Sequence, residues 1–208
     1  TLLKLVYQLK EFMSEETKQK IMDGARKSLI KEGHRRSTIK VIADYAGVNH
    51  GLVHHYFGSK EELMVALIQH QSQQVLPVLF RDHPDWLEEL LQERRPKDLA
   101  KMNQEQLDKF MDTGMDRFFS VYDDFDKILS EFMAMSAEMP KVANKLREVL
   151  RKRRKFLGLI FNNNNPGFAT LLLASLTGLL LHYRLDPKIA IKEARVLLRQ
   201  KLFDHQLE

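Results

Sequence analysis

The chain has 208 residues, of which 44% are hydrophobic and 29% are charged, as expected of a folded globular protein. It has no cysteine, which excludes disulfides, thiolate nucleophiles and cysteine zinc sites, and fits a reducing cytoplasm. The net charge of +5 lies in residues 1–60, with 11 Lys and Arg against 6 Asp and Glu, whereas residues 61–208 hold 22 of each sign. This placement predicts either a polyanionic partner for the first third of the chain or a solvated basic face.

Apolar residues recur at three- and four-residue spacing along most of the chain, and no stretch alternates as a strand would, so we predict an all-α protein. The expected helices are 14–32, 38–46, 49–57, one starting after Ser59, 84–94, 98–121, 124–138, 141–162, 167–184 and 187–205. Ser14 is the expected cap of the first helix, and Gly33 ends it. Ser59, three residues before Glu62, predicts a capping box at the start of the fourth.

Residues 38–57 have the composition of a helix-turn-helix. Ala43 is small enough for a second helix to pack closely across the first, and Gly47 tolerates the dihedral angles of a tight turn. The apolar residues expected to lock the two helices together are Ile42, Val48, Val53 and Phe57. The second helix of such a pair can project into the major groove of DNA.

That second helix, 49–57, contains neither Lys nor Glu, unlike an ordinary solvated helix face. Its outward side chains are Asn49, His50, Leu52, His54, His55 and Tyr56. An amide pairs with adenine, an imidazole donates to guanine, and a leucine contacts the thymine methyl group. Gly51 lets the backbone approach the bases, while Thr38, Lys40 and Lys60 are placed to hold phosphates. We therefore predict that these residues bind double-stranded DNA.

Two of these histidines also have a rival interpretation. His50 and His54 are four residues apart, a spacing that allows both to bind one metal ion from the same helix face. A metal site needs three or more protein ligands, and neither a cysteine nor a nearby carboxylate completes this one. DNA contact is therefore favoured, and no metal is predicted.

Three sets of positions share one fixed frame: Ala25 and Gly33; Thr38, Ile42, Ala43, Gly47 and Val48; and Phe57, Ser59, Lys60 and Leu63. In this frame residues 17–66 resemble the DNA-binding domain of the TetR family of transcriptional regulators. The sequence departs from the family at His54, where the family usually has a tyrosine that contacts the DNA backbone. Tyr56 is therefore the expected phosphate partner.

The resemblance implies a helix-turn-helix DNA-binding domain at 14–62 and a larger helical ligand-binding and dimerisation domain at 63–208. Residues 1–13 are expected to be a leader outside both domains. The family also implies a homodimer that binds a two-fold operator, with half-sites about 34–36 Å apart.

Segment 168–181 is apolar on nearly every side and has to be covered all round. It has 14 residues, fewer than the roughly 20 that span a bilayer, so no membrane partner is predicted. The predicted dimer interface consists of Leu171, Ala174, Ser175, Gly178, Leu197 and Leu198. The alternative is that both C-terminal helices belong to the core of a monomer.

Residues 102–139 hold six of the nine methionines, together with several aromatic residues. Methionine and aromatic side chains form adaptable apolar cavities, although they also form ordinary cores. The predicted pocket for a small apolar or amphipathic effector, whose identity the sequence does not give, is lined by Phe110, Met115, Phe118, Phe119, Tyr122, Phe132 and Met133.

No catalytic residue or cofactor is predicted, because the chain has no glycine-rich phosphate loop, nucleophile elbow or paired metal-ligand motif. The basic run 151–155 is interpreted as a solvated helix face. The predicted function is a DNA-binding transcriptional regulator, a repressor released from a near-palindromic operator by its ligand. One alternative is a ligand-binding or interaction module whose helix-turn-helix no longer binds DNA. The other is a small-molecule enzyme on a helical scaffold.

Overall fold

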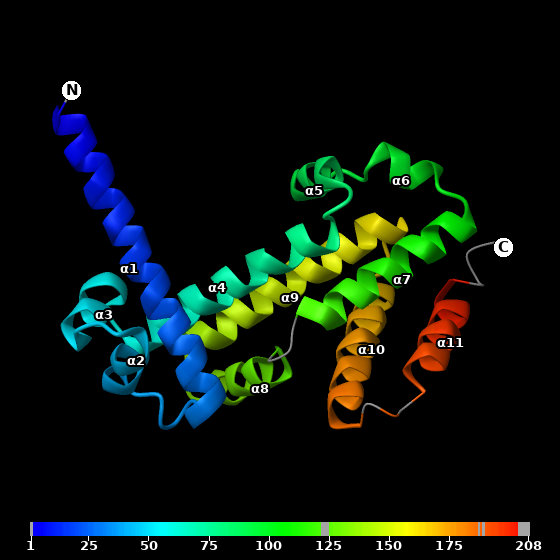
Figure 1. Cartoon of the computed structure of the whole chain (residues 1–208). Coiled ribbons are helices and arrows are strands. Elements are labelled where there is room, and N and C mark those ends of the chain that lie inside the picture. Colours follow the sequence, from blue (N-terminus) through cyan, green and yellow to red (C-terminus); the bar gives the residue numbers. More distant parts are fainter. Residues whose placement is uncertain (1, 122–124, 187, 189, 204–208) are drawn as a thin grey trace. The chain divides into compact units, whose positions relative to one another are not determined.

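The structure is a computed structural model that describes residues 2–121, 125–186, 188 and 190–203 (Figure 1). All regular structure in these residues is helical, which confirms the predicted fold class. The helices are α1 (Leu2–Glu32), α2 (Ile39–Ala46), α3 (His50–Phe57), α4 (Lys60–Leu79), α5 (Pro84–Leu91), α6 (Lys97–Lys101), α7 (Gln104–Val121), α8 (Phe125–Ser136), α9 (Pro140–Phe161), α10 (Pro166–Leu185) and α11 (Ile191–Phe203).

The helices form two compact units, each built from two segments of the chain. The first unit comprises residues 1–72 and 127–147, and the second comprises 73–126 and 148–208. Helices α4, α8 and α9 each continue from one unit into the other. The domain boundary between residues 62 and 63 stays a prediction, since a compact unit is a different criterion from a functional domain.

Helix α1 is longer than predicted, because it begins at Leu2 and runs without interruption to Glu32. The prediction that Ser14 caps it is therefore wrong: Ser14 lies inside the helix. The physical reason is that residues 2–13 contain no proline or glycine that would stop a helix. The predicted leader is thus the N-terminal part of α1.

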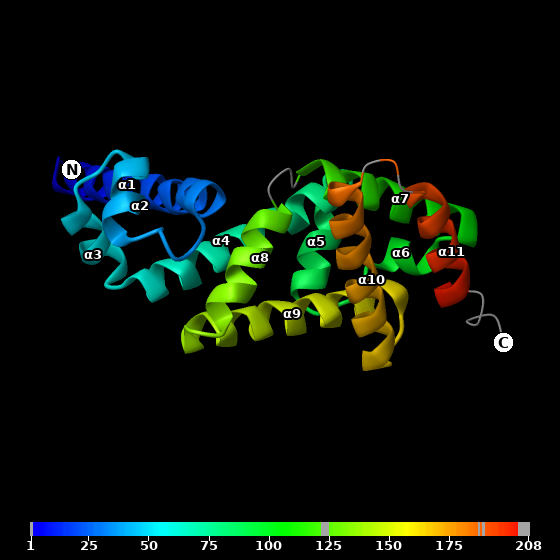
Figure 2. The same ribbon diagram turned by 90° about the horizontal axis from the view of Figure 1, so that it is seen from below.

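The core of the first unit contains the predicted stripe of α1, with Ile21, Ala25 and Leu29 all buried. Helices α1 and α2 pack against each other, as do α2 and α3, and both views show these three helices together (Figures 1 and 2). A Cβ atom on Gly24 would lie 2.6 Å from the Cβ of Ala46, closer than atoms tolerate. Glycine at position 24 thus allows the close approach of α1 and α2, a role that the sequence did not reveal.

The predicted helix 98–121 is divided into α6 and α7. The division has a local cause at Asn103, whose side-chain oxygen accepts the N–H of Gln106 at 2.9 Å, while the Gln106 side chain accepts the Asn103 N–H at 3.0 Å. This reciprocal pair is a capping box, which starts a new helix instead of continuing the old one.

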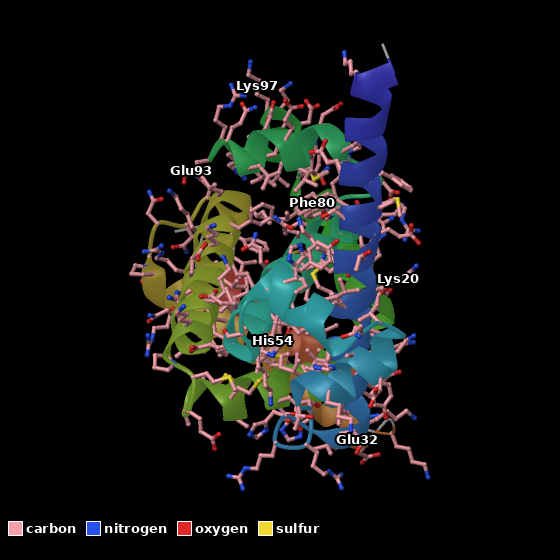
Figure 3. The ribbon with its side chains drawn as sticks, turned by 90° about the vertical axis from the view of Figure 1, so that its left-hand side faces the viewer. Lys20, Glu32, His54, Phe80, Glu93 and Lys97 are labelled. Carbon is pink, nitrogen blue, oxygen red and sulfur yellow. The ribbon has the colours of Figure 1, made fainter. Side chains whose placement is uncertain are left out.

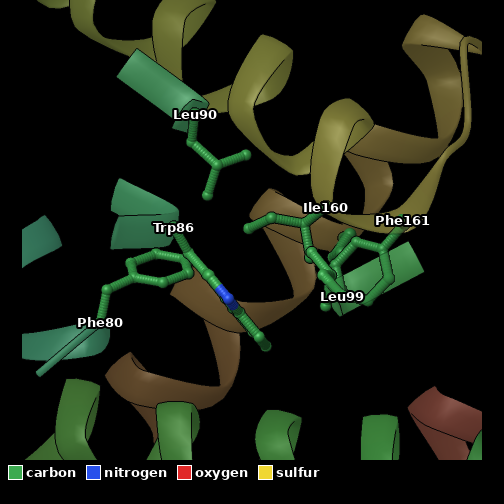
Figure 4. Close-up of a cluster of buried hydrophobic side chains, with 7 residues drawn as sticks. Phe80, Trp86, Leu90, Leu99, Ile160 and Phe161 are labelled. Atoms are coloured by element: carbon green, nitrogen blue, oxygen red, sulfur yellow. The ribbon is translucent and has the colours of Figure 1, made fainter. Parts of the chain in front are cut away.

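The second unit is organised around a cluster of buried apolar side chains (Figure 4). Its members are Phe80, Trp86, Leu90, Leu99, Ile160, Phe161 and Leu172. They come from the segments around α5 and α6 and from α9 and α10, so the cluster joins parts of the chain up to about 90 residues apart in sequence.

Candidate nucleic-acid interface

The turn between α2 and α3 has the geometry that the sequence predicted. Thr38 caps α2, with its hydroxyl accepting the N–H of Val41 at 3.3 Å. Gly47 has φ 66°, in the left-handed region that glycine adopts without strain, and Val48 N–H donates to Ala43 O at 3.1 Å. These bonds close α2 and set the direction in which α3 leaves the turn.

Helix α3 is anchored by one face and exposed on the other. Val53 is fully buried against the unit's core, while the side chains of His50, Leu52, His54 and His55 are exposed. Figure 3 shows His54 among the side chains of this part of the molecule. The exposed face of α3 carries imidazole and apolar groups without a carboxylate or an ammonium group, as predicted for a helix that reads base edges.

Between residues 49 and 57, two of the side chains predicted to contact DNA already have hydrogen-bond partners within the protein. Asn49 caps α3, because its side-chain oxygen accepts the N–H of Gly51 at 2.8 Å. His54 Nδ1 lies 3.0 Å from the carbonyl oxygen of Gly58 at the other end of the helix. His55 and Tyr56 pack ring edge against ring face, with centroids 4.9 Å apart. The roles of these residues on DNA stay predictions, as do those of the exposed His50 and Leu52.

The predicted phosphate contacts differ in their surroundings. Lys40 is exposed, but Lys60 is partly buried and its Nζ donates to the carbonyl oxygen of His34. Burial lowers the pKa of Lys60 from its ordinary value, while the nearby carboxylates of Glu138 and Glu131 oppose that shift. Ser59 accepts the Glu62 N–H at 3.2 Å, which confirms half of the predicted capping box; the Ser59 N–H donates to Phe57 O and not to the Glu62 side chain.

A hollow of about 240 Å³ lies within the second unit. It is lined by Leu79, Asp82, His83, Met102, Gln106, Lys109, Phe110, Thr113, Gly114 and Arg117. Arg117 pairs with Asp82, and this bond holds the pKa of that carboxyl below its usual range. Phe110 contacts His83 and Trp86, which stack face to face with centroids 3.9 Å apart. The hollow thus combines an aromatic wall with charged groups.

The predicted pocket residues are not gathered in that hollow. Phe110 lines it, but Phe132 is buried in the core of the first unit and Met133 is 56% exposed. The other four predicted residues, Met115, Phe118, Phe119 and Tyr122, lie outside the residues whose side chains the structure describes. The hollow is instead lined partly by polar residues, such as Arg117. The composition of the sequence did not identify these residues.

An apolar stripe is exposed along α10. Ala174 and Leu171 are exposed, Gly178 and Ser175 are partly exposed, and the same face continues through Leu181 and Leu185, which the sequence prediction missed. On α11, which contacts α10, Leu197 is 56% exposed, whereas Leu198 packs against the buried cluster. Figure 2 shows the two helices side by side.

Helix α10 is the one helix, of those the structure describes, whose length and composition would let it cross a membrane, although such a match is weak evidence. Only 17% of the window Pro166–Tyr183 is buried, so most of α10 is exposed in a single copy of the chain.

Other charged groups are paired on the surface. In the basic run 151–155, Lys152 pairs with Glu148 at 2.6 Å and Lys155 with Glu93 at 2.6 Å. Figure 3 labels Glu93. Among the described residues no group of three or more His, Asp or Glu is arranged to hold a metal ion.

The helix-turn-helix is similar in sequence to known regulatory proteins. The sequence model of a family described as "Bacterial regulatory proteins, tetR family" matches residues 21–67. The transcriptional repressor AcnR of Corynebacterium glutamicum is 29% identical over 63 residues, which are 30% of this chain and 34% of that protein. The transcriptional regulator TtgR of Pseudomonas putida is 36% identical over 55 residues, 26% of each chain. The chain thus matches about a third or less of these curated relatives' length.

Solved structures match over nearly the whole chain. A TetR transcription regulator from Haloarcula marismortui superposes with a TM-score of 0.69 at 17% identity, covering 92% of this chain and 98% of that one. The multidrug binding protein EbrR, solved in complex with imidazole, gives a TM-score of 0.63 at 19% identity, covering 90% and 89%. At this level of identity the likeness concerns the fold, and it extends to the helices beyond the helix-turn-helix.

Proposed function

We propose that this chain, whose residues 21–67 match the sequence model of the tetR family of bacterial regulatory proteins, is a member of that family: a homodimeric, ligand-responsive transcriptional regulator that acts in the cytoplasm. It binds a near-palindromic operator as a repressor, with one α3 in each of two successive major grooves. A small molecule lowers its affinity for the operator by favouring a state of the protein that binds DNA less well.

The observation that carries the DNA-binding proposal is the exposed face of α3. His50 and Leu52 project from a helix that Val53 anchors in the core; Asn49 caps its N-terminus, and Gly58 caps its C-terminus by donating its N–H to the carbonyl oxygen of His54. A rigid, capped helix with few charges of its own suits a groove whose walls are phosphate, because a carboxylate there would be repelled. Lys40 at the start of α2 adds an exposed cation next to it.

Selection of bound sequences from a random duplex pool tests this function. We expect a two-fold symmetric consensus, because two copies of α3 are related by the symmetry of the dimer. Against that consensus, His50→Ala should lose roughly 1–3 kcal/mol of binding free energy, with much less loss on a scrambled duplex of equal length. Recovery of no enriched sequence, or equal losses on both duplexes, would contradict base reading by His50.

The exposed stripe of α10 supports a homodimer. Residues 171, 174, 178, 181 and 185 follow alternating spacings of three and four, the spacing of a helix–helix seam. Ala174 and Gly178 at its centre let a partner helix approach closely. Two copies of α10 and α11 would then bury one another's apolar faces in a four-helix interface.

The hollow of the second unit supports an effector of mixed character. Phe110 and the stacked rings of His83 and Trp86 offer an apolar surface, and Arg117 and Lys109 offer positive charge. A small amphipathic molecule with an aromatic or aliphatic body and an acidic group would contact both. Such a group would compete with Asp82 for the guanidinium of Arg117.

A further inference from the structure

His34 is held from three sides in the turn that leads from α1 to α2. Its backbone N–H donates to Glu131 Oε2 at 2.6 Å, and its ring Nδ1 lies 2.9 Å from the same oxygen. Its carbonyl oxygen accepts a hydrogen bond from Lys60 Nζ. Glu131 belongs to α8 and Lys60 to α4, so two helices outside the turn fix both peptide groups and the ring of one residue.

The contact with Glu131 is shielded from solvent. The side chains of His34 and Glu131 are 14% and 26% exposed, so their attraction is screened less than that of a surface pair. A carboxylate can only accept, which requires the hydrogen of the imidazole to be on Nδ1. The other ring nitrogen, Nε2, is buried and has no hydrogen-bond partner within the described part of the chain. Glu131 is therefore the polar group that orients the ring.

The turn itself is rigid between His34 and α2. Gly33 has φ 75°, and its carbonyl oxygen accepts the hydroxyl of Ser37 at 2.8 Å. Ser28 of α1 donates to the Ser37 hydroxyl at 2.6 Å, and both serines are fully buried. The next residue, Thr38, caps α2. A displacement at His34 would therefore be passed to the first turn of α2.

We infer that Glu131, which lies far from the helix-turn-helix in sequence, is a positioning residue for DNA recognition: through His34 it holds the turn 33–38 in the geometry that presents α2 and α3 to DNA. The inference rests on the proposed DNA-binding function. Glu138 provides a matched comparison, because its carboxylate lies 3.5 Å from Arg35 on the same turn, but both side chains are largely exposed. Exposed pairs of this kind contribute little.

The test uses the full chain with Glu131→Gln, Glu131→Ala and the control Glu138→Gln. Operator affinity is measured at a temperature at which circular dichroism shows every variant fully folded. We expect Glu131→Ala to bind about tenfold more weakly, since a buried hydrogen bond to a charged acceptor is lost. The operator affinity of Glu131→Gln should lie between those of Glu131→Ala and the unaltered chain, because the amide oxygen of glutamine can still accept from His34. The affinity of Glu138→Gln should stay within about twofold of that of the unaltered chain.

Hydrogen exchange without DNA measures the turn directly. The backbone amides of residues 33–38 should exchange about tenfold faster in Glu131→Ala than in the unaltered chain. In Glu138→Gln their exchange rates should equal those of the unaltered chain. Unaltered exchange in Glu131→Ala would show that the contact does not hold the turn, and would overturn the inference.

The two readouts separate a positioning role from a purely structural one. Faster exchange or a lower melting temperature together with unaltered operator affinity would assign Glu131 to stability alone and overturn the inference. Tighter binding would overturn it as well, because the contact would then oppose the DNA-bound geometry. If the unaltered chain bound no duplex, the proposed function would fail and the inference with it. If the unaltered chain bound its operator and Glu131→Ala bound it equally well, the inference alone would fail.

Discussion

At Gly24 the packing of α1 against α2 leaves no room for a side chain. A Cβ atom there would lie 2.6–2.8 Å from the backbone and Cβ of Ala46, atoms that cannot move aside without shifting α2. We expect Gly24→Ala to lower the free energy of unfolding by about 1–3 kcal/mol, the usual cost of overpacking, despite the better helix propensity of alanine. Urea denaturation followed by circular dichroism measures the change.

Gly114 is a control for this prediction. It also lies inside a helix, α7, but a Cβ atom there would meet nothing within 4 Å. Gly114→Ala should therefore raise the free energy of unfolding by up to about 1 kcal/mol, since alanine favours the helix. If Gly24→Ala stabilised the chain as much as Gly114→Ala, the close approach of α1 and α2 would be disproved.

Single residues could be predicted from the sequence where their role is local. The cap at Thr38, the left-handed turn at Gly47 and the side-chain cap at Ser59 all depend on neighbours within four residues, and the structure confirms them. Gly24 and Glu131 could not be predicted in this way. Their partners are 22 and 97 residues away, and neither position differs from ordinary helix residues in its immediate sequence.

At the scale of the element, the exposed apolar stripe of α10 predicts a dimer, and a single substitution tests it. Leu181 belongs to this stripe and is 49% exposed, so a charge there would be desolvated in a dimer but solvated in a monomer. We expect Leu181→Glu to convert the dimer to a monomer with its helix content retained. Light scattering coupled to size exclusion measures the mass.

Leu91 on α5 provides the matched exposed leucine, at 65% exposure, outside the stripe. Leu91→Glu should leave the dimer intact. A monomeric unaltered chain, or one that sediments with lipid vesicles, would contradict the proposed dimer.

The elements themselves were largely predictable, because apolar periodicity and proline positions mark helices without knowledge of their partners. The errors in the predicted elements lie at the ends of helices. Helix α1 extends to Leu2 because nothing in its sequence stops it, and the helix expected at 98–121 divides at Asn103 because a capping box was overlooked. Which face of α10 is exposed required the structure, since that helix is apolar on nearly every side.

At the scale of the whole molecule, the excess positive charge lies in residues 1–60. Binding of DNA should therefore depend on salt through this segment, since each phosphate contact releases counterions. We expect Lys40→Ala to reduce the slope of log affinity against log salt by about one, with similar weakening on every sequence. Lys97→Ala, an exposed lysine of the second unit, should leave the slope unchanged. Equal slopes for both variants would contradict the phosphate contact at Lys40.

The first compact unit is discontinuous, since residues 1–72 are completed by 127–147. During synthesis the helix-turn-helix therefore leaves the ribosome before Glu131 has been translated. At 5–20 residues per second, about 4–15 s separate residue 72 from residue 147. In that interval the His34 amide and ring lack their acceptor, and Met135 and Val142, which are buried in the folded chain, have not yet been added. Because Glu131 is inferred to hold the turn 33–38, we expect that turn to reach its final geometry only after α8 has left the ribosome.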